Sequence, residues 1–156
     1  MIVYLFGAIL GGTLLALSFV DLREFRLPDV LTFPLIGLGF LWSYLEGNIV
    51  PALIGAALGY GVFVAIAFAF KKLRGVDGLG RGDAKLLAAG GAWVTWSGLP
   101  QIVLIASLLG IAFALAARLK PIAKAAQNSG APKDWIPFGP CLAVGIFAVW
   151  CAQQLV

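Results

Sequence analysis

Long apolar runs separated by short charged stretches constrain this chain more than any other feature. Residues 1–20 carry no charge, and about 20 apolar residues at roughly 1.5 Å each are enough to cross a bilayer core as a helix. The pattern predicts an all-α polytopic membrane protein with six transmembrane helices in a single domain, residues 1–156. The expected spans are residues 1–20, 30–45, 50–70, 84–97, 101–117 and 136–156, with a break at residues 98–100 between the fourth and the fifth.

Composition narrows the class of protein and the chemistry it can perform. The chain is 62% hydrophobic and 12% charged, whereas soluble domains carry about 25% charged residues. The absence of histidine excludes Ser-His-Asp and Cys-His catalysis and histidine-ligated metal sites. Cys141 and Cys151 would lie about 15 Å apart on one helix, too far for a disulfide, so we interpret them as small apolar residues. We expect no metal and no cofactor, and any chemistry must come from carboxylates, basic groups or hydroxyls.

Basic residues indicate how the chain is oriented in the membrane. All 11 Lys and Arg residues fall in or beside the first, third and fifth expected loops, which share one side of the membrane. The positive-inside rule predicts that these loops are cytoplasmic and that both termini lie outside. No basic stripe interleaved with aromatic residues indicates nucleic-acid binding. The Trp residues lie mostly near expected span ends, where interface anchors are found: Trp42, Trp93, Trp96, Trp135 and Trp150.

Asp21 directly follows the first uncharged run. A carboxylate there faces the negative end of a helix dipole, which is the unfavourable sign. Pairing with Arg23 or Arg26 would explain it structurally. A carboxylate placed unfavourably at a membrane boundary is nevertheless a functional candidate.

Asp83 ends the tetrapeptide Gly80-Arg81-Gly82-Asp83. The glycines allow close approach of other chain segments. The structural interpretation of Asp83 is an N-cap for the next helix, and the same role is expected for Asp29 at the start of the second span, against contact with substrate.

Together, Asp21 and Asp83 carry more weight than either alone, because the expected topology places both at the cytoplasmic edge. Two carboxyl groups within reach of one water share a proton, since both cannot ionise cheaply. One can activate the water and the other can protonate the carbonyl oxygen or the leaving amine. Their positions on the expected helices favour Asp83 as the base and Asp21 as the acid.

With these motifs assembled, the chain resembles the type IV prepilin peptidases, the Gly-x-Gly-Asp family of membrane aspartyl proteases. The resemblance rests on Asp21 with Arg23 and Leu27-Pro28-Asp29, on Gly80-Arg81-Gly82-Asp83 followed by Lys85-Leu86-Leu87-Ala88, on Gly91-Ala92-Trp93 and on Pro137-Phe138-Gly139-Pro140.

The resemblance implies an aspartic-type endopeptidase with Asp21 and Asp83 as the catalytic pair. It would cleave leader peptides of prepilins or pseudopilins at the cytoplasmic face of a prokaryotic inner membrane, in type IV pilus assembly or protein secretion. Further substrate-binding or site-shaping residues implied by the motifs are Gly80, Gly82, Lys85, Arg23, Asp29, Pro137, Phe138 and Pro140. Pro137 to Pro140 would form either an unwound stretch facing substrate or a simple helix start. No Cys-x-x-Cys region precedes the first span, so we expect the short form of the family, without methyltransferase activity.

Three other functions remain open from the sequence. A small transporter or channel would need acids near the bilayer midplane, whereas here they lie at the edges. A non-enzymatic scaffold of a secretion machine would use the charged loops as docking surfaces. A serine–lysine protease would need Ser18 and Lys85 to meet. Partners beyond substrate and membrane lipid, and the oligomeric state, do not follow from the sequence.

Overall fold

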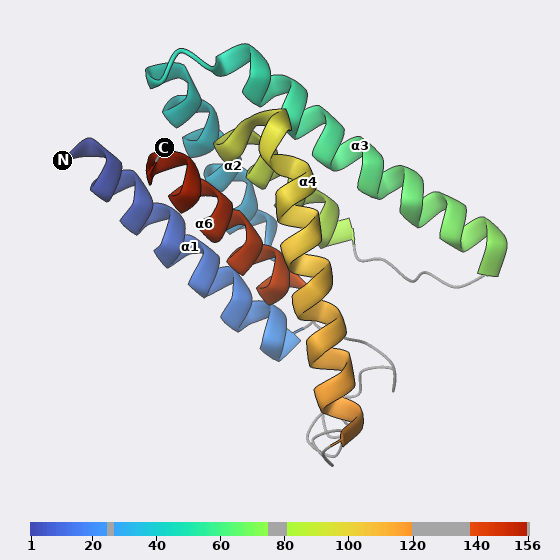
Figure 1. The fold of residues 1–156 in the computed structure, drawn as a ribbon. Coiled ribbons are helices and arrows are strands. Elements are labelled where there is room, and N and C mark those ends of the chain that lie inside the picture. Colours follow the sequence, from blue (N-terminus) through green and yellow to red (C-terminus); the bar gives the residue numbers. More distant parts are fainter. Residues whose placement is uncertain (25–26, 75–80, 120–137, 156) are drawn as a thin grey trace.

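The described part of the chain is helical throughout, as the apolar runs predict. The computed structural model describes residues 1–24, 27–74, 81–119 and 138–155, and these residues form helices with short described connections at residues 27–28 and 46–48 (Figure 1). The helices are α1 (Ile2–Glu24), α2 (Asp29–Leu45), α3 (Ile49–Arg74), α4 (Arg81–Leu119) and α6 (Gly139–Leu155).

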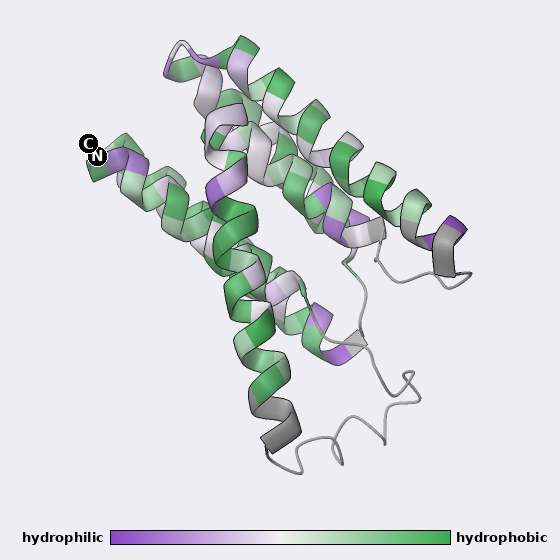
Figure 2. Cartoon of the chain, turned by 45° about the vertical axis from the view of Figure 1, so that its right-hand side comes forward, coloured by the Kyte–Doolittle hydropathy of each residue, from purple (hydrophilic) through white to green (hydrophobic). Residues whose placement is uncertain are grey.

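Within the described residues, three segments are long and apolar enough to cross a membrane: Ile2–Arg23, Ile49–Ala69 and Gly82–Leu115. Helices α2 and α6 are apolar but have 17 residues each, about 25 Å at 1.5 Å per residue and so at the short end of the spanning range. Apolar residues follow the helices along their lengths, and hydrophilic residues gather mainly near the helix ends (Figure 2). The protein is therefore an all-α membrane protein, while the count of six spans stays a prediction.

Helix α4 reverses direction between its first and last residues. The reversal lies at a different position from the break that the sequence predicts. The break was expected at residues 98–100, but the non-helical residue is Thr95, with φ 63° and ψ 179°. A Cβ built on Gly90 would lie 3.1 Å from Ile102 Cδ1, although twelve residues of straight helix span about 18 Å. The two halves of α4 therefore fold back on each other (Figure 1). Pro100 follows the reversal closely, so it lies in the opening turns of the second half, where a missing N–H is tolerated.

Side chains from neighbouring helices satisfy the carbonyl groups that this reversal frees. Ser43 Oγ donates a hydrogen bond of 2.7 Å to the carbonyl oxygen of Ala92. Gln153 Nε2 donates one of 3.1 Å to the carbonyl oxygen of Val94. Both carbonyls lie in the last turn before Thr95, where a helix leaves acceptors without partners. Helices α2 and α6 thus stabilise the reversal of α4.

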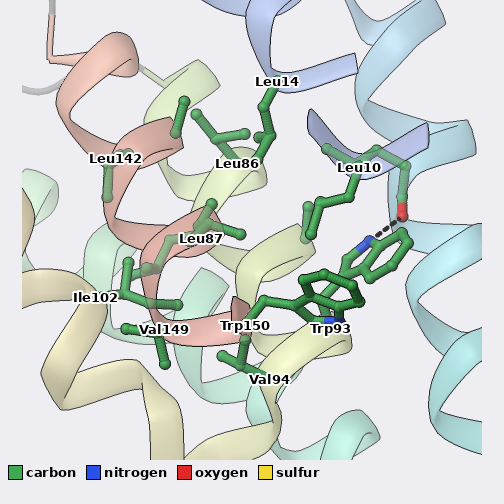
Figure 3. Packing of buried hydrophobic residues seen from close by; sticks show 14 of the residues in the cluster. Leu10, Leu14, Leu86, Leu87, Trp93, Val94, Ile102, Leu142, Val149 and Trp150 are labelled. Atoms are coloured by element: carbon green, nitrogen blue, oxygen red, sulfur yellow. Dashed lines mark hydrogen bonds between the residues drawn. The ribbon is translucent and has the colours of Figure 1, made fainter. Parts of the chain in front are cut away.

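Three tryptophans form the core rather than the membrane interface. Trp42, Trp93 and Trp150 are each at most 4% exposed, so the expectation that they are interface anchors is wrong. They pack with Phe6 at ring-centroid distances of 5.1 to 6.3 Å. Trp93 Nε1 donates to the carbonyl oxygen of Leu35 at 2.9 Å, and Trp93 lies beside Trp150 (Figure 3). Burying indoles here ties α1, α2, α4 and α6 together.

Glycines let α3 cross the first half of α4 at backbone contact. A Cβ on Gly55 would lie 2.6 Å from the carbonyl oxygen of Gly91, and one on Gly59 would lie 2.7 Å from that of Leu87. Small residues at such crossings allow membrane helices to pack closely. This crossing fixes the first half of α4, whose opening turn carries Asp83.

Candidate active site

Asp21 lies in the last turn of α1 and is only 6% exposed. Its Oδ2 accepts a hydrogen bond of 3.2 Å from the backbone N–H of Gly139, the first residue of α6. The first N–H groups of a helix have no partner inside it and carry its positive dipole end. The buried carboxyl group is thus held by the N-terminus of α6, although these residues are 118 positions apart.

Gly139 leaves no room for a side chain beside that carboxyl group. A Cβ built on Gly139 would lie 2.5 Å from Asp21 Oδ2 and 2.9 Å from its Cγ. The carbonyl oxygen of Phe138 accepts from the N–H of Leu142 at 3.1 Å, which starts α6. Phe138 packs against the core, and Pro140 lies in the first turn of α6, where it needs no N–H donor. The described part of this segment is therefore a helix start and is not unwound.

Asp83 lies in the first turn of α4, which begins at Arg81, so the expected N-cap role is wrong. Asp83 is partly buried, and the charge of Asp21 acts on it electrostatically. A Cβ on Gly82 would lie 2.9 Å from Leu27 Cβ. Glycine is thus required at position 82 so that the connection before α2 can approach the start of α4.

An ion pair joins the starts of α2 and α4. Lys85 Nζ lies 2.5 Å from Asp29 Oδ1 and 5.5 Å from the ring centroid of Phe33. Asp29 is the first residue of α2 and Pro28 occupies the N-cap, so the N-cap role expected for Asp29 is wrong. Lys85 therefore pairs with a carboxylate, and no contact with Ser18 links it to a serine nucleophile among the described residues.

Arg23 does not neutralise Asp21 in the described structure. Its guanidinium carbon lies 4.2 Å from the ring centroid of Phe19, one turn back along α1. Within the described ranges, the hydrogen-bond partner of the Asp21 carboxyl group is the N–H of Gly139. The other expected site residues, Gly80 and Pro137, and the alternative partner Arg26 lie outside the described residues.

The structure removes the ground on which acid and base were assigned. The sequence favours Asp21 as the acid because it ends a helix, but the N-terminus of α6 adjoins it. Asp83 also lies at a helix N-terminus. Helix position therefore does not distinguish an acid from a base between these two groups.

Sequence reasoning overlooked Gly139 and Leu27 as site residues. Both stand inside the motifs Leu27-Pro28-Asp29 and Pro137-Phe138-Gly139-Pro140, next to residues with more evident chemistry. A glycine between phenylalanine and proline at a helix start is the signal that could have pointed to Gly139, because glycine there indicates close approach by another group.

The site contains the carboxyl groups of Asp21 and Asp83. The backbone N–H of Gly139 donates to Asp21, which is buried, and Asp83 is partly buried. These features suit general acid–base chemistry on a water molecule. In the parts of the chain that the structure describes, no three His, Cys, Asp or Glu side chains gather as a metal site requires. The fold and this site define a class: helical membrane proteins with paired carboxyl groups at one end of the bundle.

The chain belongs to the type IV leader peptidase family, whose model matches residues 8–115. It is 44% identical over 147 residues to a prepilin leader peptidase/N-methyltransferase of Aeromonas salmonicida (strain A449), covering 92% of this chain and 47% of the relative. The protein of that name in Xanthomonas campestris pv. campestris is 43% identical over 150 residues, covering 93% and 49%. That of Dickeya chrysanthemi is 48% identical over 111 residues, covering 69% and 39%.

The chain therefore spans about half the length of the first two of these relatives, whose printed name joins two activities. No solved structure matches the chain.

Proposed function

We propose that this chain is a membrane aspartyl endopeptidase that cleaves the leader peptides of type IV prepilins or pseudopilins, with Asp21 and Asp83 as its catalytic residues. The observation that carries the proposal is the burial of Asp21 against the N-terminus of α6, within electrostatic reach of Asp83. Membership of the type IV leader peptidase family supports the substrate class. The proposal concerns the peptidase activity alone.

The reaction balances with the two carboxyl groups and one water. The ionised carboxylate takes a proton from the water, whose oxygen attacks the scissile carbonyl carbon. The protonated partner gives its proton to the carbonyl oxygen, forming a neutral tetrahedral diol. The protonated carboxyl group then gives its proton to the leaving nitrogen as the carbon–nitrogen bond breaks, while the other, ionised carboxylate takes a proton from one diol hydroxyl, which leaves the new carboxyl group and restores one protonated and one ionised aspartate.

We assign the remaining motif residues to shaping this site. Gly139 donates to Asp21, and Gly82 admits Leu27 against the start of α4. Lys85 and Asp29 join α2 to α4 two residues beyond Asp83. None of these groups needs to touch the scissile bond in order to set the separation of the two carboxyl groups.

The ion pair gives a test of this shaping role. Lys85→Met is expected to lower kcat/KM about five-fold with little loss of stability, because a half-exposed pair contributes at most about 1 kcal/mol. The exchange Asp29→Lys with Lys85→Asp restores the pair in reverse and should recover most of the activity. Cleavage kinetics in detergent provide the measurement, and a double exchange no better than Lys85→Met alone would contradict the assignment.

The six-span topology is also a proposal, with the two halves of α4 as the fourth and fifth crossings. The charged connections after α1, α3 and α4 would then face the cytoplasm, together with Asp21 and Asp83. We expect a membrane-impermeant thiol reagent to label Asn48→Cys but not Lys72→Cys in spheroplasts, after both native cysteines are replaced by alanine. Labelling of both positions from outside, or the reverse pattern, would contradict the topology.

A cleavage assay tests the function itself. The purified chain is mixed in detergent with a prepilin-type substrate, and product masses are read by mass spectrometry. A single cut that is insensitive to chelators and serine reagents is the expected result. If the folded protein cuts none of several prepilins, the transporter or scaffold interpretation replaces the proposal.

A further inference from the structure

Helix α3 continues well past the level of Asp83 before it reaches a charged residue. In the antiparallel crossing of α3 with the first half of α4, a Cβ on Gly59 would lie 2.7 Å from the carbonyl oxygen of Leu87. One helical turn further on, Phe63 therefore lies at the level of Asp83, and Phe63 is still buried. Lys71 is the first charged residue of α3. It follows Phe63 by eight residues, which is about 12 Å along the helix axis.

The second half of α4 extends past the other aspartate by the same amount. A Cβ on Gly110 would lie 3.3 Å from Phe138 Cε2, and Phe138 directly precedes Gly139, whose N–H donates to Asp21. Gly110 is therefore near the level of Asp21. Arg118, the first charged residue of this half, follows eight residues later, again about 12 Å along the axis. Both helices run past the starts of α6 and of the first half of α4 (Figure 1).

The side chains along these two extensions are apolar and exposed. The apolar spanning segments of α3 and α4 continue to Ala69 and Leu115. Exposed apolar side chains that continue a membrane-spanning segment belong in the hydrocarbon layer. Hydrocarbon therefore surrounds α3 and the second half of α4 at the level of the two aspartates and beyond it. The large apolar side chains concerned are Val64, Ile66, Phe68, Ile111, Phe113 and Leu115.

Helices α1 and α2 carry exposed charged groups at that same level. Arg23 follows Asp21 by two residues and is exposed. The side chain of Asp29 is 54% exposed although Asp29 pairs with Lys85. A charged group is costly in hydrocarbon, and the short side chain of Asp29 cannot reach a distant surface as a long basic side chain does. The ends of α1 and α2 therefore contact a polar environment at a level where α3 and α4 contact hydrocarbon.

We propose that the ends of α1 and α2 form a contact surface for the polar head-group layer of the membrane, which there lies about 12 Å deeper along the bundle than at α3 and the second half of α4. The inference rests on the proposed function and topology, because this surface would admit the water that hydrolysis at Asp21 and Asp83 consumes. The described residues of the surface are Leu22, Arg23, Asp29, Val30 and Lys85.

Spin labels placed at one level of the bundle test the proposal. The full chain, with both native cysteines replaced by alanine, is reconstituted in liposomes of phosphatidylcholine and phosphatidylglycerol and labelled at one introduced cysteine. Power saturation with oxygen and with a water-soluble nickel chelate distinguishes a label in lipid from a label in water. Exposed positions near the level of the aspartates are changed for this purpose: Leu22→Cys, Val30→Cys, Val64→Cys and Ile111→Cys.

Lys72→Cys provides the reference for a polar environment, because it lies on α3 eight residues beyond Val64, about 12 Å along the axis. We expect Leu22→Cys and Val30→Cys to match Lys72→Cys, with the nickel chelate as the more effective relaxant. We expect Val64→Cys and Ile111→Cys to be relaxed mainly by oxygen. All of these positions are exposed, so a label displaces no core side chain.

Thermal unfolding shows that each labelled variant is folded, and two positions on each side keep the comparison complete if one variant does not fold. An oxygen-to-nickel ratio at Leu22→Cys and Val30→Cys equal to that at Val64→Cys would overturn the proposal. Nickel access to Val64→Cys and Ile111→Cys as high as to Lys72→Cys would do the same. Because peptide cleavage is not the readout, failure here leaves the peptidase proposal untouched.

Discussion

Replacing Asp21 or Asp83 with asparagine is expected to abolish peptide cleavage while the protein stays folded. Asparagine can neither take a proton from water nor give one to the carbonyl oxygen, and general acid–base catalysis contributes about 10²- to 10⁴-fold per group. We therefore expect each variant to lose at least about 10³-fold in kcat. The amide oxygen of Asp21→Asn can still accept from the N–H of Gly139, so the contact between α1 and α6 survives.

The measurement is the yield of the leader-free product over time, read by mass spectrometry, with thermal unfolding recorded for each variant. Asp134→Asn makes the same chemical change outside both motifs and serves as the matched control, with cleavage unchanged. The double variant should be no slower than either single variant, because the two groups act as a unit. Cleavage within ten-fold of the original in either single variant would remove that residue from the catalytic pair.

The helices could be predicted from the sequence because each apolar run is long enough to lie in lipid. There the backbone N–H and C=O groups must form hydrogen bonds within their own segment. The sequence also predicts that Asp21 and Asp83 pair, since alternation of the charged stretches puts both at one edge of the expected bundle. These predictions need only the lengths of the apolar runs and the positions of the charged stretches along the chain. The helices are confirmed for the described residues, and the pairing of the two carboxyl groups stays a prediction.

Features that depend on tertiary contact could not be read in this way. Gly98 and Pro100 suggest a break, but the reversal occurs at Thr95, where Ser43 and Gln153 supply hydrogen bonds from other helices. The contact of Lys85 with Asp29 joins residues 56 positions apart. No local pattern encodes either arrangement, because the stabilising partners come from distant segments.

The contact between Gly139 and Asp21 gives the second large expected effect. Gly139→Ala places a methyl group 2.5 Å from Asp21 Oδ2 and 2.9 Å from Cγ, so the carboxyl group must move or α6 must shift. Displacing a reacting group by about 1 Å can cost 10²-fold in rate. We therefore expect kcat to fall about 10²-fold in Gly139→Ala while KM changes little, since the substrate-contacting surface is otherwise unchanged.

Gly12→Ala is the matched control, because Gly12 lies on the same helix as Asp21 and a Cβ there meets nothing within 4 Å. It should leave kcat unchanged and leave stability equal or slightly higher, because alanine has a higher helix propensity than glycine.

Thermal unfolding of Gly139→Ala separates a general loss of packing from a specific loss of active-site geometry. A packing defect would lower the melting temperature and the yield of active enzyme together, whereas a positioning role lowers kcat of the folded enzyme and shifts its pH–rate profile, because the partner of Asp21 has moved. If Gly139→Ala cleaves at the original rate, the N-terminus of α6 does not position Asp21 for the reaction.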